Sequence, residues 1–467
     1  MLSKSSFPVE IVEKIVEEHI IQNFTLNKKE NRGDNSKTER KDKLRQNKAL
    51  LSLALGCKSF TAPALRAIWH TLDSLEPLLK LLTNSKVDDR TYDLTSKPSE
   101  ASLERFDFYA RMVKKIIVQG STWSYPSKNS VLVRLSVFQN LSLARPTPLP
   151  SLTSSECSAS SFARAMMFFI SPKLQEATFR FDSQAQFRIE GASMWRYLDV
   201  VKEKCPAFQR LDIDINGQGG GGVLRVPSVF QFDDLRHLSL VGFTSVETIS
   251  AENGHLVSEF LSGRRMARLE SLKLDIPKLA IKSRTEESES ASKSQSQSQT
   301  ESASNQDPDA LPKSLKALSL SLSFDDYASD IAVPRLIQLY RASPVQFFQL
   351  TGHQVDIDKN DIFQTIASSP SWSGLATIIV HSDFDFDIGM KLGVFSVSEY
   401  ISPLYELRQL RVVRFLNLFN RYNITNDDIW TMCEAWPELE EPHFGFTGGC
   451  HWRPAGESYC FFVDDSV

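Results

Sequence analysis

LRHLSL at residues 235–240 alternates leucine with polar side chains over the length of one β-strand. Two similar copies follow it, LESLKL at 269–274 and LKALSL at 315–320. Their starting positions differ by 269 − 235 = 34 and by 315 − 269 = 46 residues. A strand of this pattern buries one face only, so it needs neighbouring copies to complete a core. We therefore predict a fold of stacked, strand-containing repeats.

The alternating pattern extends beyond these three copies. Apolar runs of strand length recur from about residue 131 onward, at 174–181, 208–215, 235–241, 269–276, 315–322, 376–380 and 407–413. Their spacing varies more than in a regular repeat protein, which indicates degenerate copies. We expect an irregular α/β solenoid over 131–440, in which parallel strands line one surface and leucines stack behind them.

Two polar inserts interrupt the pattern. Residues 282–310 contain nine serines and no apolar residue larger than alanine, which accounts for the longer second interval. Residues 27–48 contain nine Lys or Arg and four Asp or Glu. Neither insert buries enough surface to offset its ordering entropy, so we predict disorder at 282–310 and a flexible loop at 27–48. The basic run at 37–45 also fits a nuclear-localisation signal, although a solvated loop is the favoured interpretation.

The first part of the chain has the apolar periodicity of helices. A first helix is predicted around residues 12–20 and a second from about 49 to 60. A third is predicted from Pro63, with Thr61 as its N-cap. A further amphipathic segment at 103–118 ends in an apolar run that we interpret as a first strand.

These patterns divide the chain into four parts. Residues 1–82 are predicted to be a helical module, and 83–130 a connecting helical segment. The repeats occupy 131–440, and 441–467 is predicted to be an irregular tail because it does not continue the repeat.

Composition limits the class of protein. The chain has 467 residues, a formal net charge of −4 and a pI of about 6.1, so nothing in its charge predicts nucleic-acid binding. No signal peptide is readable, and no run approaches 18 uncharged apolar residues, so we expect no membrane association. The six cysteines form no CxxC pair, which favours a reducing compartment. We expect an intracellular protein, located in the cytoplasm, the nucleus or both.

Ligand-binding motifs are absent or incomplete. The chain has no GxSxG, HExxH or P-loop. GQGGGG at 217–222 has no following helix to bind phosphate, and we predict a flexible hairpin there. DIDKND at 356–361 begins like a calcium loop but lacks its glycine and its final glutamate. Asp383, Asp385 and Asp387 fit a solvated strand edge better than a site.

Four zinc-capable residues lie near the end of the chain: His443, Cys450, His451 and Cys460. Their irregular spacing disfavours a shared ion. We expect no metal, no cofactor and no catalytic residue, since no nucleophile, base and orienting group can be assembled from the sequence.

The N-terminal segment resembles an F-box. FPVEIVEKIVEEHI at 7–20 is similar to the opening Leu-Pro-x-Glu pattern, with Phe7 in place of the usual leucine. LLSLALGCKSF at 50–60 resembles the second F-box helix, and Leu65 and Trp69 match the closing leucine and tryptophan.

The resemblance covers most of the chain and extends to fungal F-box proteins with irregular leucine-rich repeats. Four further segments are similar to that family, at 62–82, 105–116, 168–179 and 426–440. It implies a short all-α F-box-like module followed by a leucine-rich-repeat-like α/β solenoid. The insert at 27–48 departs from the family because it splits the F-box between its first two helices.

The resemblance also implies a function. Such a chain is the substrate-recognition subunit of an SCF-type E3 ubiquitin ligase, which binds a Skp-type adaptor and, through it, a cullin. The residues implied at the adaptor are Phe7, Pro8, Ile11, Ile15, Leu50, Leu53, Cys57, Phe60 and Trp69. Three short helices are too thin a layer to bury all of these side chains, which favours an exposed apolar patch. The alternative is a leucine-rich-repeat interaction scaffold without a ligase role, and the sequence does not identify a protein target for either.

Overall fold

The computed structural model describes residues 10–11, 14, 16, 36–82, 91–94, 97–118, 132–158, 166–181, 184–215, 222–224, 232–246, 268–275, 314–322, 337–338, 340–352, 362–382, 395–396, 398, 401–416, 422–423, 425–445, 450–455 and 458–463. The chain divides into two compact units. The first comprises Met1–Arg180 and Glu190–Phe208, and the second comprises Phe181–Ile189 and Gln209–Val467.

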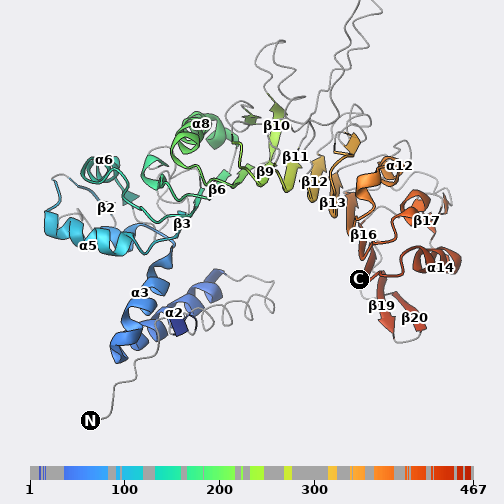
Figure 1. The fold of residues 1–467 in the computed structure, drawn as a ribbon, viewed down its shortest axis with the longest axis horizontal. Helices are drawn as coiled ribbons and strands as arrows, with labels where there is room; N and C mark the ends of the chain where they lie inside the picture. The colour runs from blue at the N-terminus through green and yellow to red at the C-terminus, as the bar shows by residue number, and fades with distance from the viewer. Residues whose placement is uncertain are drawn as a thin grey trace, which may run out of the picture. The chain divides into compact units, whose positions relative to one another are not determined.

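Helices and strands are interspersed along the chain, and strands predominate between residues 210 and 352 (Figure 1). The α-helices of the described residues are α2 (Ser36–Gly56), α3 (Lys58–His70), α4 (Glu76–Leu79), α5 (Glu100–Ala110), α6 (Leu135–Ala144), α8 (Gln184–Lys204), α12 (Ile362–Ala367) and α14 (Asn426–Ala435). Short 3-10 helices are η2 (Met166–Phe169), η7 (Pro370–Trp372) and η8 (Ser402–Glu406).

Twelve strands belong to one open sheet, in the order β1-β3-β5-β6-β7-β9-β11-β12-β13-β14-β16-β18. They are β1 (Thr71–Leu72), β3 (Lys115–Val118), β5 (Ser154–Ser158), β6 (Glu176–Phe181), β7 (Arg210–Ile215), β9 (His237–Val241), β11 (Ser271–Asp275), β12 (Ala317–Leu322), β13 (Phe347–Gly352), β14 (Thr377–Ser382), β16 (Val412–Leu416) and β18 (Glu441–Gly445). Every neighbouring pair whose register is defined runs parallel. The predicted mixed α/β fold with a parallel sheet is confirmed.

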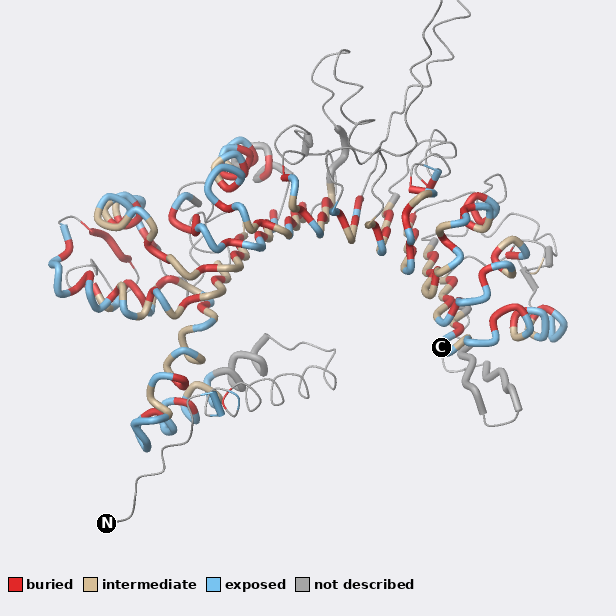
Figure 2. The backbone as a smooth tube through the Cα atoms, viewed as in Figure 1, coloured by how far each residue is buried: buried red, intermediate tan, exposed pale blue. Residues whose placement is uncertain are grey.

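Within the second unit, the buried side chains of neighbouring strands lie in direct register. Leu238 of β9, Leu272 of β11 and Leu318 of β12 are partners, and the row continues through Phe348 and Ile378. All five are buried, and buried and partly exposed positions alternate along each strand (Figure 2). A second buried row lies two residues further along: Leu240, Leu274, Leu320, Leu350 and Val380. Each such side chain contributes roughly 1.5–3 kcal/mol when removed from water.

The repeated motif is wider than the leucine-rich copies show. A buried apolar residue also lies three positions before the first buried residue of the strand. This spacing occurs in 208–213 and 345–350, although neither segment is an obvious leucine repeat. In β5 the corresponding strand position is Ser155, which is buried, and the Tyr197 hydroxyl of α8 lies against it. The core thus accommodates a small hydroxyl side chain at one buried strand position.

A repeated backbone contact joins the amino ends of neighbouring strands. The Arg236 carbonyl accepts hydrogen bonds from the N–H groups of Glu270 (2.8 Å) and Ser271 (2.9 Å). The Glu270 carbonyl accepts from Lys316 (2.8 Å) and Ala317 (3.0 Å) in the same way. The other carbonyls that accept two consecutive N–H groups are those of Lys114, Thr153, Gln209, Lys316, Gln346, Ala376 and Arg411. Because these backbone groups are satisfied in only one register, the contact opposes slippage.

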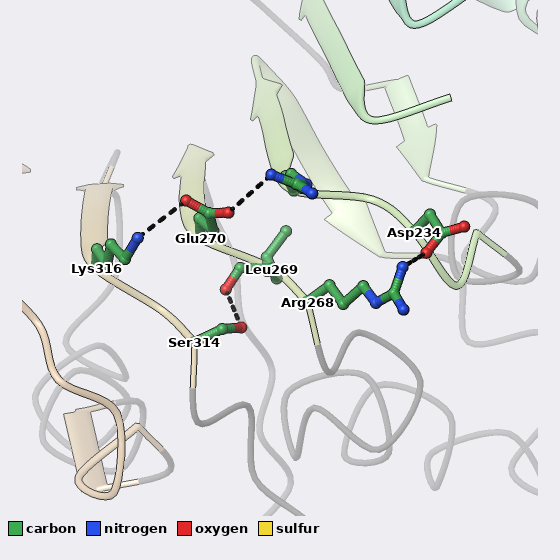
Figure 3. A network of polar contacts seen from close by, with 7 residues as sticks. Asp234, Arg268, Leu269, Glu270, Ser314 and Lys316 are labelled. Atoms are coloured by element: carbon green, nitrogen blue, oxygen red, sulfur yellow. Dashed lines mark hydrogen bonds and ion pairs between the residues drawn. The ribbon is translucent and has the colours of Figure 1, made fainter. Parts of the chain in front are cut away.

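Charged side chains form a ladder beside this contact (Figure 3). Glu270 lies between Arg236 (Nη1 to Oε1, 3.4 Å) and Lys316 (Nζ to Oε2, 3.2 Å). Asp234 and Arg268 form a further ion pair between neighbouring repeats. The hydrogen bond and charge of Lys316 hold the pKa of Glu270 below its usual value. Exposed pairs of this kind contribute little stability, so the ladder mainly orders the strand ends.

Two buried indoles link successive repeats of the second unit. Trp372 Nε1 donates to the Tyr340 carbonyl at 3.1 Å, and Trp436 Nε1 donates to the Leu404 carbonyl at 3.0 Å. Both pairs are separated by 32 residues, and both tryptophans stand five residues before a strand. Each indole therefore lies between two repeats and gives a carbonyl a second donor, in addition to the N–H of Ser343 or Leu407.

The predicted loop at 27–48 is wrong in its second half. α2 begins at Ser36 and continues without a break through Gly56, while 27–35 lie outside the described residues. Lys, Arg, Glu and Gln are good helix formers. A polar segment can therefore extend a helix whose apolar part is anchored further along the chain.

The third helix also begins earlier than predicted. α3 starts at Lys58, so Pro63 lies inside it and Thr61 is not an N-cap. The Thr61 hydroxyl instead donates to the Ala54 carbonyl at 2.8 Å. This bond ties α3 to α2 where the chain turns between them.

The chain contains more strands than the sequence predicted. β8 (Gly222–Leu224) pairs in parallel with β10 (Phe243–Val246), so the predicted hairpin at the glycine run is wrong. The segment after 440 is not irregular, since β18 pairs with β16 and β19 (Cys450–Ala455) forms an antiparallel hairpin with β20 (Ser458–Val463). Two shorter parallel pairs are β2 (Thr91–Tyr92) with β4 (Leu132–Val133) and β15 (Phe395–Ser396) with β17 (Tyr422–Asn423).

The segment predicted as a helical connection contains α5 but also β3, which confirms the first strand expected at its end. β3 belongs to the large sheet, so 83–130 contribute a repeat as well as a connection. The predictions for 282–310, 356–361 and the aspartates at 383–387 lie outside the described residues.

Candidate docking surfaces

The layer of α2 and α3 carries leucines on its outer face. Leu50 and Ala54, one turn apart, are buried, with Leu50 only 4% exposed. Leu44, Leu51 and Leu55 share another face of α2 because they are spaced by seven and four residues. Leu51 is 48% exposed and Leu55 is 80% exposed. We call Leu44, Leu51 and Leu55 the leucine stripe. A row of exposed leucines on one helix face is typical of a surface that another molecule covers.

Aromatic side chains of α3 and α5 form a second group at the surface of the first unit. Trp69 and Tyr109 stack with ring centroids 4.5 Å apart and an interplanar angle of 33°. Phe108 meets Tyr109 edge to face at 5.0 Å and is itself more than half exposed. Trp69 and Tyr109 are partly exposed, so the three rings form an aromatic surface on the first unit. Large aromatics of this kind dominate the energetics of protein interfaces.

The structure separates the nine residues implied at the adaptor into groups. Leu53, Cys57 and Ile11 are exposed, and Phe60 and Trp69 are partly exposed. Leu50 is buried and supports the layer from within. Three others lie outside the described residues: Phe7, Pro8 and Ile15.

Cys57 occupies a distinctive position at the junction of the two helices. It is the N-cap residue of α3, with extended backbone angles. The N–H of Ser59, together with the Ser59 hydroxyl and the Phe60 N–H, holds the pKa of the Cys57 thiol below its usual value. Helix N-termini stabilise thiolates in this way. The other described cysteines differ: burial raises the pKa of Cys205 to about 11 and that of Cys157 still higher.

The face of the sheet opposite the leucine rows is a second candidate surface. In the middle of the second unit it carries small side chains such as Ser239 and Ser319. Toward its end it carries the partly exposed apolar side chains of Phe347, Ile379 and Val412. Phe347 and Val412 lie in the same row across the sheet. Ile379 lies on β14, the strand between theirs, two positions beyond that row.

Charged residues border this apolar group. Arg414, on the same face, pairs with Glu441 of β18. Lys273 is exposed on the outer face of β11. An apolar centre with a polar margin is the usual composition of a protein-binding surface.

Sequence reasoning missed several of these residues. Leu44, Leu51 and Leu55 would have been predicted on one helix face only if the predicted helix had continued through the polar insert, as α2 does. Phe108 and Tyr109 were assigned to a connecting helix, and nothing in the sequence predicted that Tyr109 stacks on Trp69. That contact joins residues 40 positions apart in the chain, which periodicity cannot detect.

Neither a metal-binding cluster nor a membrane-spanning helix is found among the described residues. In the described ranges, no group of three His, Cys, Asp or Glu side chains is placed to hold a metal ion. In the C-terminal hairpin Cys450 pairs with Val463 and Cys460 with Arg453, so the two cysteines are not cross-strand neighbours. Among the described helices, none combines the length and the apolar composition needed to cross a bilayer.

Comparisons with known proteins give no assignment. No protein-family model matches the chain, and no curated protein sequence matches it significantly.

Proposed function

We propose that the chain is the substrate-recognition subunit of an SCF-type E3 ubiquitin ligase. The layer of α2 and α3 binds a Skp-type adaptor, and a cullin binds through it. The leucine stripe carries this proposal, because Leu51 and Leu55 present exposed apolar surface on one face of α2. Exposed Leu53 and partly exposed Phe60 and Trp69 add to it.

The second part of the proposal concerns the sheet. Parallel strands with buried residues in register, joined by the same carbonyl contact at each junction, support a leucine-rich-repeat-like solenoid. Its outer face holds a protein target, with Phe347, Ile379 and Val412 as the apolar centre of the contact. The location follows from that of its partners, in the cytoplasm, the nucleus or both.

This function requires no chemistry from the chain itself. Binding of a target and of the adaptor raises the effective concentration of the target near a ubiquitin-charged enzyme. The rate of transfer then depends on the two affinities and on the geometry that joins them.

One observation favours a second candidate, an interaction scaffold without a ligase role. α2 has 21 residues, and it continues through the segment that departs from the F-box family. If the polar first half of α2 blocks the approach of an adaptor, the leucine stripe would bind a different helical partner instead. The sheet would keep its target-binding role.

Co-purification tests the proposal. The full chain is co-expressed with a Skp-type adaptor and the complex is isolated by size exclusion. A stable complex is expected for the wild type. Leu51→Asp combined with Leu55→Asp weakens it by roughly 100-fold, since each buried leucine contributes roughly 1.5–3 kcal/mol and 1.4 kcal/mol is tenfold. Leu53→Asp and Trp69→Asp also weaken the complex.

A matched control uses a leucine exposed on another helix. Leu143 of α6 is more exposed than Leu55, and Leu143→Asp leaves the complex intact. Absence of a complex with the wild type would leave the scaffold function, and equal loss with Leu143→Asp would show that the effect is not specific to the stripe.

A further inference from the structure

The inference concerns α14, a helix whose start and end are both fixed. Its N-cap is Thr425, whose hydroxyl accepts from the Asp428 N–H while the Asp428 carboxylate accepts from the Thr425 N–H at 2.7 Å. At its other end, Arg408 Nη1 donates to the carbonyls of Glu434 (2.8 Å) and Ala435 (3.2 Å). Asp428, Met432 and Ala435 are the buried residues of the helix, so its opposite face is held outward on a rigid support.

The outward face of α14 carries an indole between two carboxylates. Trp430 is 62% exposed, although large aromatics are usually buried in a folded chain. Asp427 precedes it by three residues and Glu434 follows it by four, and both are exposed. Residues spaced by three and four are neighbours on a helix surface, so the three side chains form one continuous patch.

Among the described residues, the carboxylates of this patch lack the ion pairs that neighbouring acidic residues form. Glu438 pairs with Arg411 at 3.0 Å, and Glu441 pairs with Arg414. No ion pair involves Asp427 or Glu434 among the described residues. The guanidinium of Arg408 is bonded to the backbone carbonyl of Glu434. The outward face of α14 is therefore aromatic and acidic at once.

We propose that this face binds a segment of a partner protein that carries arginine or lysine. A cation is the group that both components attract: the carboxylates by charge and hydrogen bonds, and the indole face by its quadrupole. Asp427 and Glu434 are separated by roughly 10 Å along the helix, at 1.5 Å per residue. An extended segment with basic residues three positions apart spans the same distance, at roughly 3.3 Å per residue.

The negative charge of this face of α14 disfavours other kinds of binding partner. A nucleic acid or an acidic segment would be repelled by Asp427 and Glu434. An uncharged apolar helix would bury two carboxylates without partners, which is costly. The site is distinct from the leucine stripe, so it exists whether or not the chain binds a Skp-type adaptor.

The experiment follows Trp430 directly. The full chain is labelled with 5-fluorotryptophan, and among its seven tryptophans the signal of Trp430 is assigned by its loss in Trp430→Phe. The probe is a glycine–serine octapeptide with two arginines three positions apart. We expect this peptide to shift the Trp430 fluorine signal saturably at low salt and to leave the signals of buried Trp372 and Trp436 unchanged.

Matched peptides and variants provide the controls. Octapeptides with two glutamates or two glutamines in place of the arginines cause no shift. Asp427→Asn combined with Glu434→Gln weakens arginine-peptide binding about fivefold, and added salt weakens it further. Unchanged signals of the other tryptophans show that this variant is folded.

Three outcomes would overturn the proposal. The first is the absence of a saturable shift up to about 10 mM peptide. The second is an equal shift with the glutamine peptide. The third is a shift with protein concentration alone, which would mean that a second copy of the chain covers the face. Adaptor co-purification is unaffected by any of these results, so the two proposals fail separately.

Discussion

Leucine has opposite roles in α2 and in the sheet of the second unit. Leu238, Leu272 and Leu318 are buried in one row between neighbouring strands. Leu51 and Leu55 of α2 are largely exposed. In the sheet the neighbouring repeats supply the covering side chains, whereas the second face of α2 keeps Leu51 and Leu55 exposed. A leucine pattern therefore indicates core where a further copy follows, and a docking surface where none does.

The largest effect is expected in the buried row. Leu318→Ala leaves a cavity between β11 and β13 and should lower the free energy of unfolding by about 3 kcal/mol, measured by urea denaturation. Ser319→Ala, on the opposite face of the same strand, should change it by less than about 0.5 kcal/mol. If the two variants were equally stable, the row would not be the core of the second unit.

The second-largest effect on stability is expected at Trp372, whose indole links two repeats. Trp372→Phe keeps most of the ring but removes the donor to the Tyr340 carbonyl. The Tyr340 carbonyl keeps the Ser343 N–H as a donor at 2.9 Å, so the lost hydrogen bond costs about 1 kcal/mol. The smaller ring also leaves a cavity at a buried site, and urea denaturation would show both effects as a lower midpoint. Trp430→Phe on the outer face of α14 serves as the matched control and should be nearly neutral. A neutral Trp372→Phe would mean that the repeats do not depend on this contact.

A small effect on stability is expected at the leucine stripe. Leu51→Asp and Leu55→Asp each change the free energy of unfolding by less than about 0.5 kcal/mol, because both side chains are exposed before and after substitution. Circular dichroism during thermal unfolding measures this. A large loss of stability would place these leucines in the chain's own core and remove the contrast with the sheet.

The smallest effect is expected in the alkylation rate of Cys57, at the junction of α2 and α3. Because the pKa of Cys57 is lowered by the Ser59 N–H, its thiolate persists to lower pH than an ordinary thiolate and reacts faster at pH 7. Iodoacetamide labelling followed by mass spectrometry should modify Cys57 well before Cys157 or Cys205, whose pKa values are raised by burial. Ser59→Ala removes only the hydroxyl and slows the reaction slightly. Comparable rates at all three cysteines would contradict the N-cap geometry.

The sequence predicted the sheet better than the helices around it. Strands with leucine at alternating positions, such as β9, β11 and β12, were predicted because period-two alternation has a direct physical cause. β5 was missed since Ser155 occupies a buried strand position where the other copies have an apolar residue. β13 was missed because phenylalanine and valine stand where the other copies have leucine.

The candidate site was predictable in type but not in detail. Helical periodicity identified an apolar surface on 49–60, but it selected buried Leu50 in place of exposed Leu51 and Leu55. One residue is a turn of about 100° on a helix, so Leu50 and Leu51 face different directions, and periodicity alone does not say which apolar face the rest of the chain covers. The stacking of Trp69 on Tyr109 depends on tertiary packing, for which one sequence contains no signal.

Hydrogen–deuterium exchange of the full chain, with and without a purified Skp-type adaptor, tests the central claim most directly. The account predicts slower amide exchange within residues 44–70 in the presence of the adaptor and unchanged exchange in β9–β14. Protection confined to the sheet, or no protection anywhere at saturating adaptor, would contradict it.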